Sequence, residues 1–198
     1  MKKRFFIIIT LIITLFSLYT LSFADTTEND FQIYSSGSVL IDAKTGKILL
    51  QKDMNKKLYP ASTTKILTAI LAIENLNLDS KLTASRSAVM AIPSGYSNAG
   101  IKIGESLSVS DLLEMFLIHS ANEVGYILAE EISGNIDNFA NLMNKKASEL
   151  GCTNTHFTNP SGIHDVNHYS TAYDMALIAK YCMQNETFRN IVNKKSCK

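Results

Sequence analysis

The chain has 198 residues, in which 19 Lys and Arg nearly balance 18 Asp and Glu and give a formal net charge of +1. Because no basic cluster follows the N-terminus, this balance speaks against a nucleic-acid-binding protein. The three cysteines are odd in number and widely spaced, and they contain no C-x-x-C pair, which argues against a disulfide framework and a zinc site.

Residues 1–24 have the pattern of an export signal. Basic residues at positions 2–4 precede an apolar run, and Ser22-Phe23-Ala24 places small residues at both cleavage-determining positions. Loss of the three basic residues changes the formal net charge from +1 to −2. We expect an exported, extracytoplasmic protein of the cell envelope. The apolar run is long for a signal, so an uncleaved membrane anchor is the alternative.

The exported part divides into a polar, flexible lead-in at 25–35 and one domain at 36–198, which is long enough to bury a sizeable core. Its first predicted element is a β-hairpin formed by 38–42 and 47–51, in which Gly46 of Lys44-Thr45-Gly46 supplies the turn. A long apolar helix at 62–75 is expected next. It is followed by a mixed segment at 82–101 with a loop at 94–98, a helix at 110–119 capped by Ser110, and a helix at 122–132. The last predicted elements are a helix at 137–150 closed by Gly151, a loop at 153–167, a helix to residue 183 that starts with a capping box of Thr171 and Asp174, and a helix at 186–192.

The first candidate site lies at the start of the apolar helix. Ser62 and Lys65 are three residues apart, so a helical turn places them on one face. A serine hydroxyl is a weak nucleophile and needs a base, and burial of the lysine would lower its pKa enough for this role. The alternative is an N-capped helix with a solvated lysine, because one S-x-x-K is expected by chance in a chain of this length.

A second pattern, Ser120-Ala121-Asn122, lies between two predicted helices. Serine and asparagine two residues apart at a helix junction can point into one cleft, where the hydroxyl relays a proton and the amide donates and accepts hydrogen bonds. The rival match Ser133-Gly134-Asn135 lies where a helix ends, and Gly134 is typical of a C-terminal cap. We therefore favour Ser120 and Asn122.

The histidines give a weaker signal. His164 and His168 are four residues apart but follow Asn159-Pro160-Ser161-Gly162, which is typical of a turn, so their rings are not expected to share a metal. His119 adjoins Ser120, and adjacent helical residues face different directions. We expect no metal and no organic cofactor.

Taken together, these motifs resemble those of the D-alanyl-D-alanine carboxypeptidases, which are low-molecular-mass penicillin-binding proteins. The resemblance covers roughly residues 36 to 193 and rests on six segments: Gly37–Lys47, Tyr59–Lys65, Gly104–Val109, Ser120–Glu123, Asn159–Gly162 and His168–Asp174. It implies an α+β fold of the β-lactamase/transpeptidase-like class, with an antiparallel sheet flanked by helices and a helical subdomain.

The resemblance also implies roles for the site residues. Ser62 would attack the D-Ala-D-Ala end of a peptidoglycan stem peptide and form an acyl-enzyme, with Lys65 as general base. Ser120 would relay a proton to the leaving D-Ala, and Asn122 would bind the substrate. β-Lactam antibiotics would acylate Ser62, and membrane association is a further expectation.

The family's third motif, K-T-G, is expected on a strand well after the S-x-N motif. Here Lys44-Thr45-Gly46 precedes Ser62, so we interpret it as hairpin-turn chemistry and expect the chain to end before the catalytic triplet. The C-terminal strands of the sheet would be lost with it. Two alternatives remain open: a serine β-lactamase of the same fold, and an inactive truncated product.

Overall fold

The computed structural model describes residues 32–196. Contacts divide the chain into one unit up to Tyr34 and a second, Ser35–Lys198. The predicted signal at 1–24 and residues 25–31 of the lead-in lie outside the described residues, so both stay predictions. Within residues 32–196, no helix is long and apolar enough to cross a bilayer.

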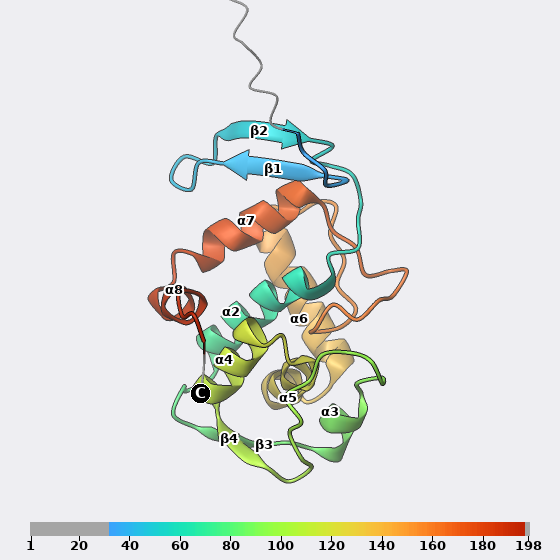
Figure 1. Ribbon diagram of the computed structural model, residues 1–198, viewed down its shortest axis with the longest axis vertical. Helices are drawn as coiled ribbons and strands as arrows, with labels where there is room; N and C mark the ends of the chain where they lie inside the picture. Colours follow the sequence, from blue (N-terminus) through green and yellow to red (C-terminus); the bar gives the residue numbers. More distant parts are fainter. Residues whose placement is uncertain (1–31, 197–198) are drawn as a thin grey trace, which may run out of the picture. The chain divides into compact units, whose positions relative to one another are not determined.

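The second unit is built from helices and two small antiparallel sheets (Figure 1), which confirms the predicted α+β class. Helix α2 (Lys65–Asn75) runs through its centre and is preceded by a single 3-10 turn, η1 (Ala61–Thr64). The other elements are β1 (Ser38–Ile41), β2 (Ile48–Lys52), β3 (Lys81–Thr83), α3 (Arg86–Met90), β4 (Ser106–Ser108), α4 (Val109–Ile118), α5 (Asn122–Ser133), α6 (Ile136–Glu149), α7 (Ala172–Cys182) and α8 (Glu186–Val192).

The predicted first hairpin is present as β1 and β2, which pair with Leu40 opposite Leu50. Its turn is held by Asp42, whose Oδ1 accepts hydrogen bonds from the Thr45 backbone at 2.6 Å and hydroxyl at 2.7 Å. Gly46 has a φ of 77°, which glycine adopts without strain. The interpretation of Lys44-Thr45-Gly46 as a turn is therefore confirmed.

A second sheet was missed by sequence reasoning. Strands β3 and β4 pair with Leu82 opposite Leu107, and they lie at the other end of the unit from the hairpin (Figure 1). Residues 82–101 were expected only as a mixed segment with a loop, and no strand was predicted there. Each strand has only three residues, too few to show the alternation that predicts a strand.

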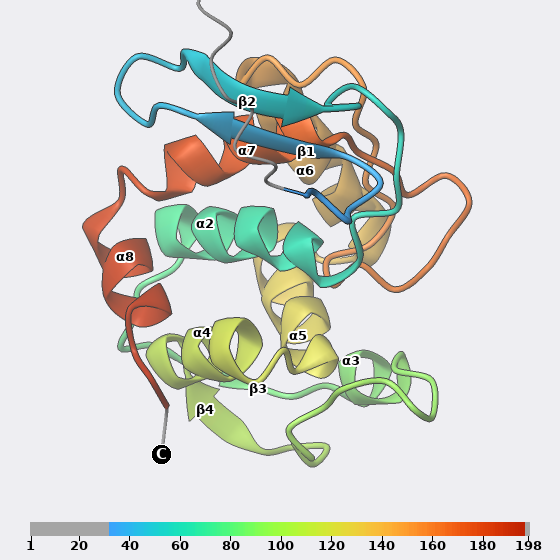
Figure 2. The ribbon, with the colours of Figure 1, turned by 45° about the horizontal axis from the view of Figure 1, so that its top comes forward.

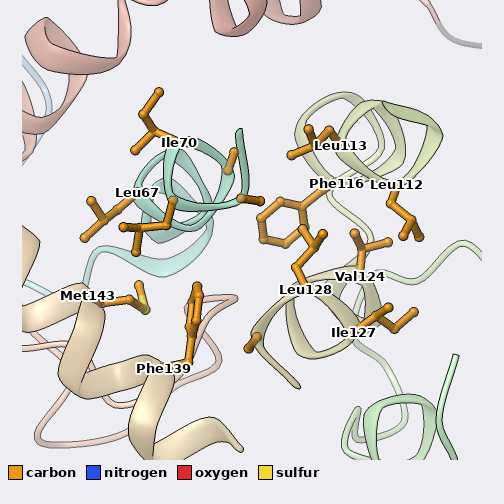
Figure 3. Packing of buried hydrophobic residues seen from close by; sticks show 14 of the residues in the cluster. Leu67, Ile70, Leu112, Leu113, Phe116, Val124, Ile127, Leu128, Phe139 and Met143 are labelled. Carbon is orange, nitrogen blue, oxygen red and sulfur yellow. The ribbon is translucent and has the colours of Figure 1, made fainter. Parts of the chain in front are cut away.

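The core surrounds α2 on several sides. Helix α7 lies between α2 and the hairpin, and α4 and α5 pack on the opposite side of α2 (Figure 2). Figure 3 shows Phe116 of α4 pointing into the space between α2 and α5, and Phe139 and Met143 of α6 lying below α2. All three side chains are fully buried. This packing explains why α2 is apolar on almost every face.

Two local predictions need correction. Ser108, and not Ser110, caps α4, because its hydroxyl accepts the Asp111 N–H. Thr171 does cap α7, but no capping box forms. The Asp174 carboxylate instead accepts hydrogen bonds from the Asn154 backbone at 2.8 Å and the Thr155 hydroxyl at 2.7 Å. Two tertiary hydrogen bonds to an adjacent loop outcompete one local bond.

Candidate active site

Ser62 lies in the 3-10 turn η1, directly before α2. The turn has no side-chain cap, and Ala61 has a φ of 47°, a left-handed conformation that is strained for any residue except glycine. The Lys65 Nζ donates a hydrogen bond to the Ser62 Oγ at 3.2 Å. The pairing expected from the S-x-x-K spacing is present, although Ser62 is in a 3-10 turn and not in the helix itself.

The amine of Lys65 is enclosed by protein. The side chain is 3% exposed, and besides Ser62 the Nζ contacts the Asn122 Oδ1 at 2.7 Å and the Ser161 carbonyl at 2.9 Å. Three acceptors therefore match the three donors of an ammonium group. The alternative of an N-capped helix with a solvated lysine is wrong.

Burial changes the acidity of this amine. Loss of solvation lowers the pKa of Lys65 from 10.5 to about 8, and the negative charge of Glu123 opposes this shift. At pH 7 roughly one amine in ten is then neutral, against far fewer for an ordinary lysine. A neutral amine beside Ser62 can accept the hydroxyl proton.

Ser120 and Asn122 complete the cluster from the junction between α4 and α5. Ser120 has a φ of 58°, and its hydroxyl lies 3.2 Å from the Ser62 Oγ. Asn122 is the first residue of α5, and its Nδ2 donates to the Ser97 carbonyl at 2.8 Å. This bond fixes the amide orientation and leaves the Oδ1 facing Lys65. The structure thus brings all four predicted residues together from two segments.

Sequence reasoning assigned no role to three contributors to the site. The Ser97 carbonyl orients Asn122, the Ser161 carbonyl binds Lys65, and Glu123 is a buried carboxylate that acts on the Lys65 amine. Glu123 and Ser161 lie in two of the segments on which the family resemblance rests, whereas Ser97 does not. Backbone carbonyls can come from any residue type, so sequence carries no direct signal for these contacts.

The rejected candidates have other partners. Gly134 ends α5 with a φ of 76° and Asn135 caps α6, so the rival S-x-N match is structural. His164 packs edge-on against Tyr59, and His168 is buried and bound to Thr64. In residues 32–196, no group of three or more His, Cys, Asp and Glu side chains could hold a metal.

A cleft of about 430 Å³ opens beside the cluster of Ser62, Lys65 and Ser120. One part of its wall is polar and comes from Ser62, Thr63, Lys65 and Ser120. The rest is largely apolar and comes from α2, α4, α7 and α8: Ile66, Phe116, Leu117, Ala179, Met183, Phe188 and Val192. A small ligand could therefore reach the Ser62 hydroxyl from an open, apolar surface.

A family model described as D-alanyl-D-alanine carboxypeptidase matches residues 24–197. The chain belongs to this family. The resemblance inferred from the sequence motifs is thereby confirmed, as is the predicted fold class.

Individual relatives agree with this assignment. The chain is 41% identical over 156 residues to the D-alanyl-D-alanine carboxypeptidase DacF of Bacillus subtilis (strain 168), a match that covers 77% of this chain and 40% of the relative. It is 34% identical to DacA of Haemophilus influenzae, over 78% of this chain and 40% of the relative. The chain thus spans about 40% of the length of these relatives.

Solved structures of family members superpose well on the unit. The D-alanyl-D-alanine carboxypeptidase DacD from Francisella tularensis has a TM-score of 0.77 at 35% identity, with 84% of this chain and 41% of that chain covered. Penicillin binding protein 6B from Escherichia coli has a TM-score of 0.79 at 28% identity, with 84% and 56% covered.

Proposed function

We propose that Ser62, Lys65, Ser120 and Asn122 form the active site of a serine-type D-Ala-D-Ala carboxypeptidase, which removes the terminal D-Ala from peptidoglycan stem peptides. The observation that carries this proposal is the pair of contacts made by the Ser62 hydroxyl. It lies 3.2 Å from the buried Lys65 amine and 3.2 Å from the Ser120 hydroxyl. These contacts give a nucleophile, a base and a proton relay within one hydrogen-bonded chain.

In the acylation step, the neutral Lys65 amine takes the proton of Ser62 while the Ser62 Oγ bonds to the penultimate D-Ala carbonyl carbon. The bond between this carbon and the terminal D-Ala nitrogen then breaks. Ser120 passes a proton, replaced from Lys65, to that nitrogen, so D-Ala leaves as a neutral amine. Asn122 holds the Lys65 amine and presents its amide to the substrate backbone.

In the deacylation step, the water oxygen attacks the ester carbonyl while one water proton passes to the neutral Lys65 amine. The bond between the carbonyl carbon and the Ser62 oxygen then breaks, and Lys65 returns a proton to that oxygen. The shortened stem peptide is released and Ser62 is regenerated. A β-lactam follows the first step, because its strained amide opens on attack by Ser62. Its amine stays tethered to the acyl group, so it cannot diffuse away and a long-lived adduct is expected.

The position of the K-T-G motif affects the expected rate of Ser62 acylation. In the printed sequence K-T-G occurs once, in the turn of the first hairpin. A substrate-carboxylate site and one oxyanion-hole N–H are therefore not supplied by a K-T-G strand among the described residues 32–196. One oxyanion donor contributes about 2.7–4 kcal/mol, or about 10²–10³ in rate. We expect residues 1–198 alone to acylate more slowly, by this factor, than a chain that carries such a strand.

The proposal includes location. The predicted signal at residues 1–24 would carry the domain out of the cytoplasm and into the cell envelope. Its substrate, the cell-wall stem peptide, is found there. Whether the protein is then released or held at the membrane depends on cleavage after Ala24.

The test is intact-mass analysis after incubation with benzylpenicillin. The full chain is expressed with its own N-terminus and purified after export, so the same mass shows whether residues 1–24 have been removed. We expect an adduct that peptide mapping places on Ser62, none in Ser62→Ala, and an unchanged adduct in Ser133→Ala, which alters the rival S-x-N match. Release of D-Ala from a D-Ala-D-Ala peptide, but not of L-Ala from its D-Ala-L-Ala counterpart, would establish the carboxypeptidase reaction.

Other outcomes decide against the proposal. A folded chain without any adduct would support the inactive alternative, and an adduct on another residue would remove Ser62 as nucleophile. Rapid turnover of benzylpenicillin, with no adduct that persists, would favour the β-lactamase alternative.

A further inference from the structure

The segment between α6 and α7 lies against the turn that carries Ser62 (Figure 2). Its first contact is made by the backbone of residues 160–162. The Pro160 carbonyl accepts the Thr68 hydroxyl at 2.7 Å, and the neighbouring Ser161 carbonyl accepts the Lys65 amine. Gly162 comes so close that a Cβ on it would lie 1.8 Å from the Ala61 carbonyl oxygen.

The same segment also holds the chain just before the turn. Ser170 and Leu58 exchange two backbone hydrogen bonds, of 2.8 and 2.9 Å, four residues ahead of Ser62. Strained backbone such as that of Ala61 persists only where its surroundings impose it. The segment therefore acts as a rigid support for the turn.

One side chain of the segment reaches the turn itself. His168 is 2% exposed, and its Nε2 lies 2.8 Å from the hydroxyl of Thr64. Thr64 is fully buried and stands between Ser62 and Lys65 in the sequence. His168 and Thr64 are 104 positions apart. A hydrogen bond at this point fixes the residue that joins the nucleophile to the base.

The donor in this bond can be assigned. The backbone N–H of Thr158 donates to the His168 Nδ1 at 3.1 Å, so Nδ1 is an acceptor and carries no proton. A neutral imidazole then has its proton on Nε2, which donates to the Thr64 hydroxyl. Burial lowers the pKa of His168 to about 4, so the ring stays neutral at physiological pH.

We propose that His168 is a positioning residue, which holds the Ser62 turn in its reactive geometry by donating from Nε2 to Thr64. This inference rests on the proposed function for its catalytic consequence, but the contact itself does not. Without the bond, Thr64 can rotate and the strained turn can relax, which would move the Ser62 hydroxyl away from the Lys65 amine. Misplacement of reacting groups by about 1 Å can lower a rate by about a hundredfold.

Two substitutions separate the two faces of the ring. In His168→Gln the amide nitrogen reaches the position of Nε2 and keeps the donor to Thr64. In His168→Asn the amide oxygen takes the position of Nδ1 and keeps the acceptor for the Thr158 N–H, but nothing reaches Thr64. Each variant loses one hydrogen bond, so their melting temperatures serve as a matched control for a merely structural role.

Acylation by benzylpenicillin, measured per folded molecule in the full chain, should fall about tenfold or more in His168→Asn and change by less than about threefold in His168→Gln. Thr64→Val should resemble His168→Asn. Combining Thr64→Val with His168→Asn should lower the rate no further, because both remove the same bond.

A second measurement does not need activity. Nitrogen-15 NMR should find the proton of His168 on Nε2, and carbon-13 NMR of the lysines should find the Lys65 pKa shifted toward that of an ordinary lysine in His168→Asn but not in His168→Gln. If wild-type chain forms no adduct, the proposed function fails while these spectra still decide the role of His168. A proton on Nδ1, or equal behaviour of the two variants in both assays, would overturn the proposal.

Discussion

Replacing Gly162 by alanine tests the close contact between the supporting segment and the Ser62 turn. Gly162 has a φ of +84°, and an added Cβ would lie 1.8 Å from the Ala61 carbonyl oxygen, whereas real Cβ contacts are essentially never shorter than 3.0 Å. The turn and the segment must therefore separate by about 1.2 Å, the difference between these two distances. Because Ala61 directly precedes Ser62, this movement reaches the nucleophile.

The expected energy has two parts. A left-handed backbone costs a non-glycine residue about 1–2 kcal/mol, and overpacking of a tight contact adds about 1–3 kcal/mol. Gly104→Ala is a matched control, since Gly104 has a φ of +85° and no atom within 4 Å of an added Cβ, so only the backbone part applies. We expect Gly104→Ala to lower the free energy of unfolding by about 1–2 kcal/mol and Gly162→Ala by about 2–5 kcal/mol.

Two assays follow from these figures. Urea unfolding compares the two variants with wild type, and benzylpenicillin acylation per folded molecule should fall about a hundredfold in Gly162→Ala only. The reasoning is refuted if Gly162→Ala unfolds like Gly104→Ala, because the clash would then be absorbed without strain. It is also refuted if Gly162→Ala is clearly less stable yet acylates at the wild-type rate, because the turn would then move without disturbing Ser62.

Three further predictions concern charge and packing. The acylation rate should rise with pH with a midpoint near 8, because the neutral form of Lys65, with its pKa of about 8, is the base; a flat profile between about pH 6 and 9 would contradict this. Glu123→Gln should move that midpoint to lower pH, since the Glu123 charge raises the Lys65 pKa, whereas Glu131→Gln, at an exposed position of the same helix, should leave it in place. Phe139→Ala should lower the free energy of unfolding by about 3–5 kcal/mol in urea titrations, because the fully buried ring leaves a cavity beneath α2; a loss below about 1 kcal/mol would mean that the core refills the space.

The sequence by itself determined most of the local structure. The α8 helix has the predicted bounds, α5 and α6 agree with prediction to within a residue at each end, and Gly134 ends α5 as its sequence context indicated. These features depend on neighbours within a few positions, so caps and helical periodicity predict them. The spacing of Ser62 and Lys65 likewise fixes their proximity, because one turn of helix or 3-10 helix joins them.

The tertiary structure alone decided how the site works. The low pKa of Lys65 depends on burial, and its three partners come from positions as distant as Ser161. No sequence pattern gives the total burial of a side chain or identifies which carbonyl will face it. The β3–β4 pair and the redirected Asp174 carboxylate were missed for the same reason. In each case a contact between segments distant in the sequence outweighs the local preference, and such contacts form only when the chain has packed.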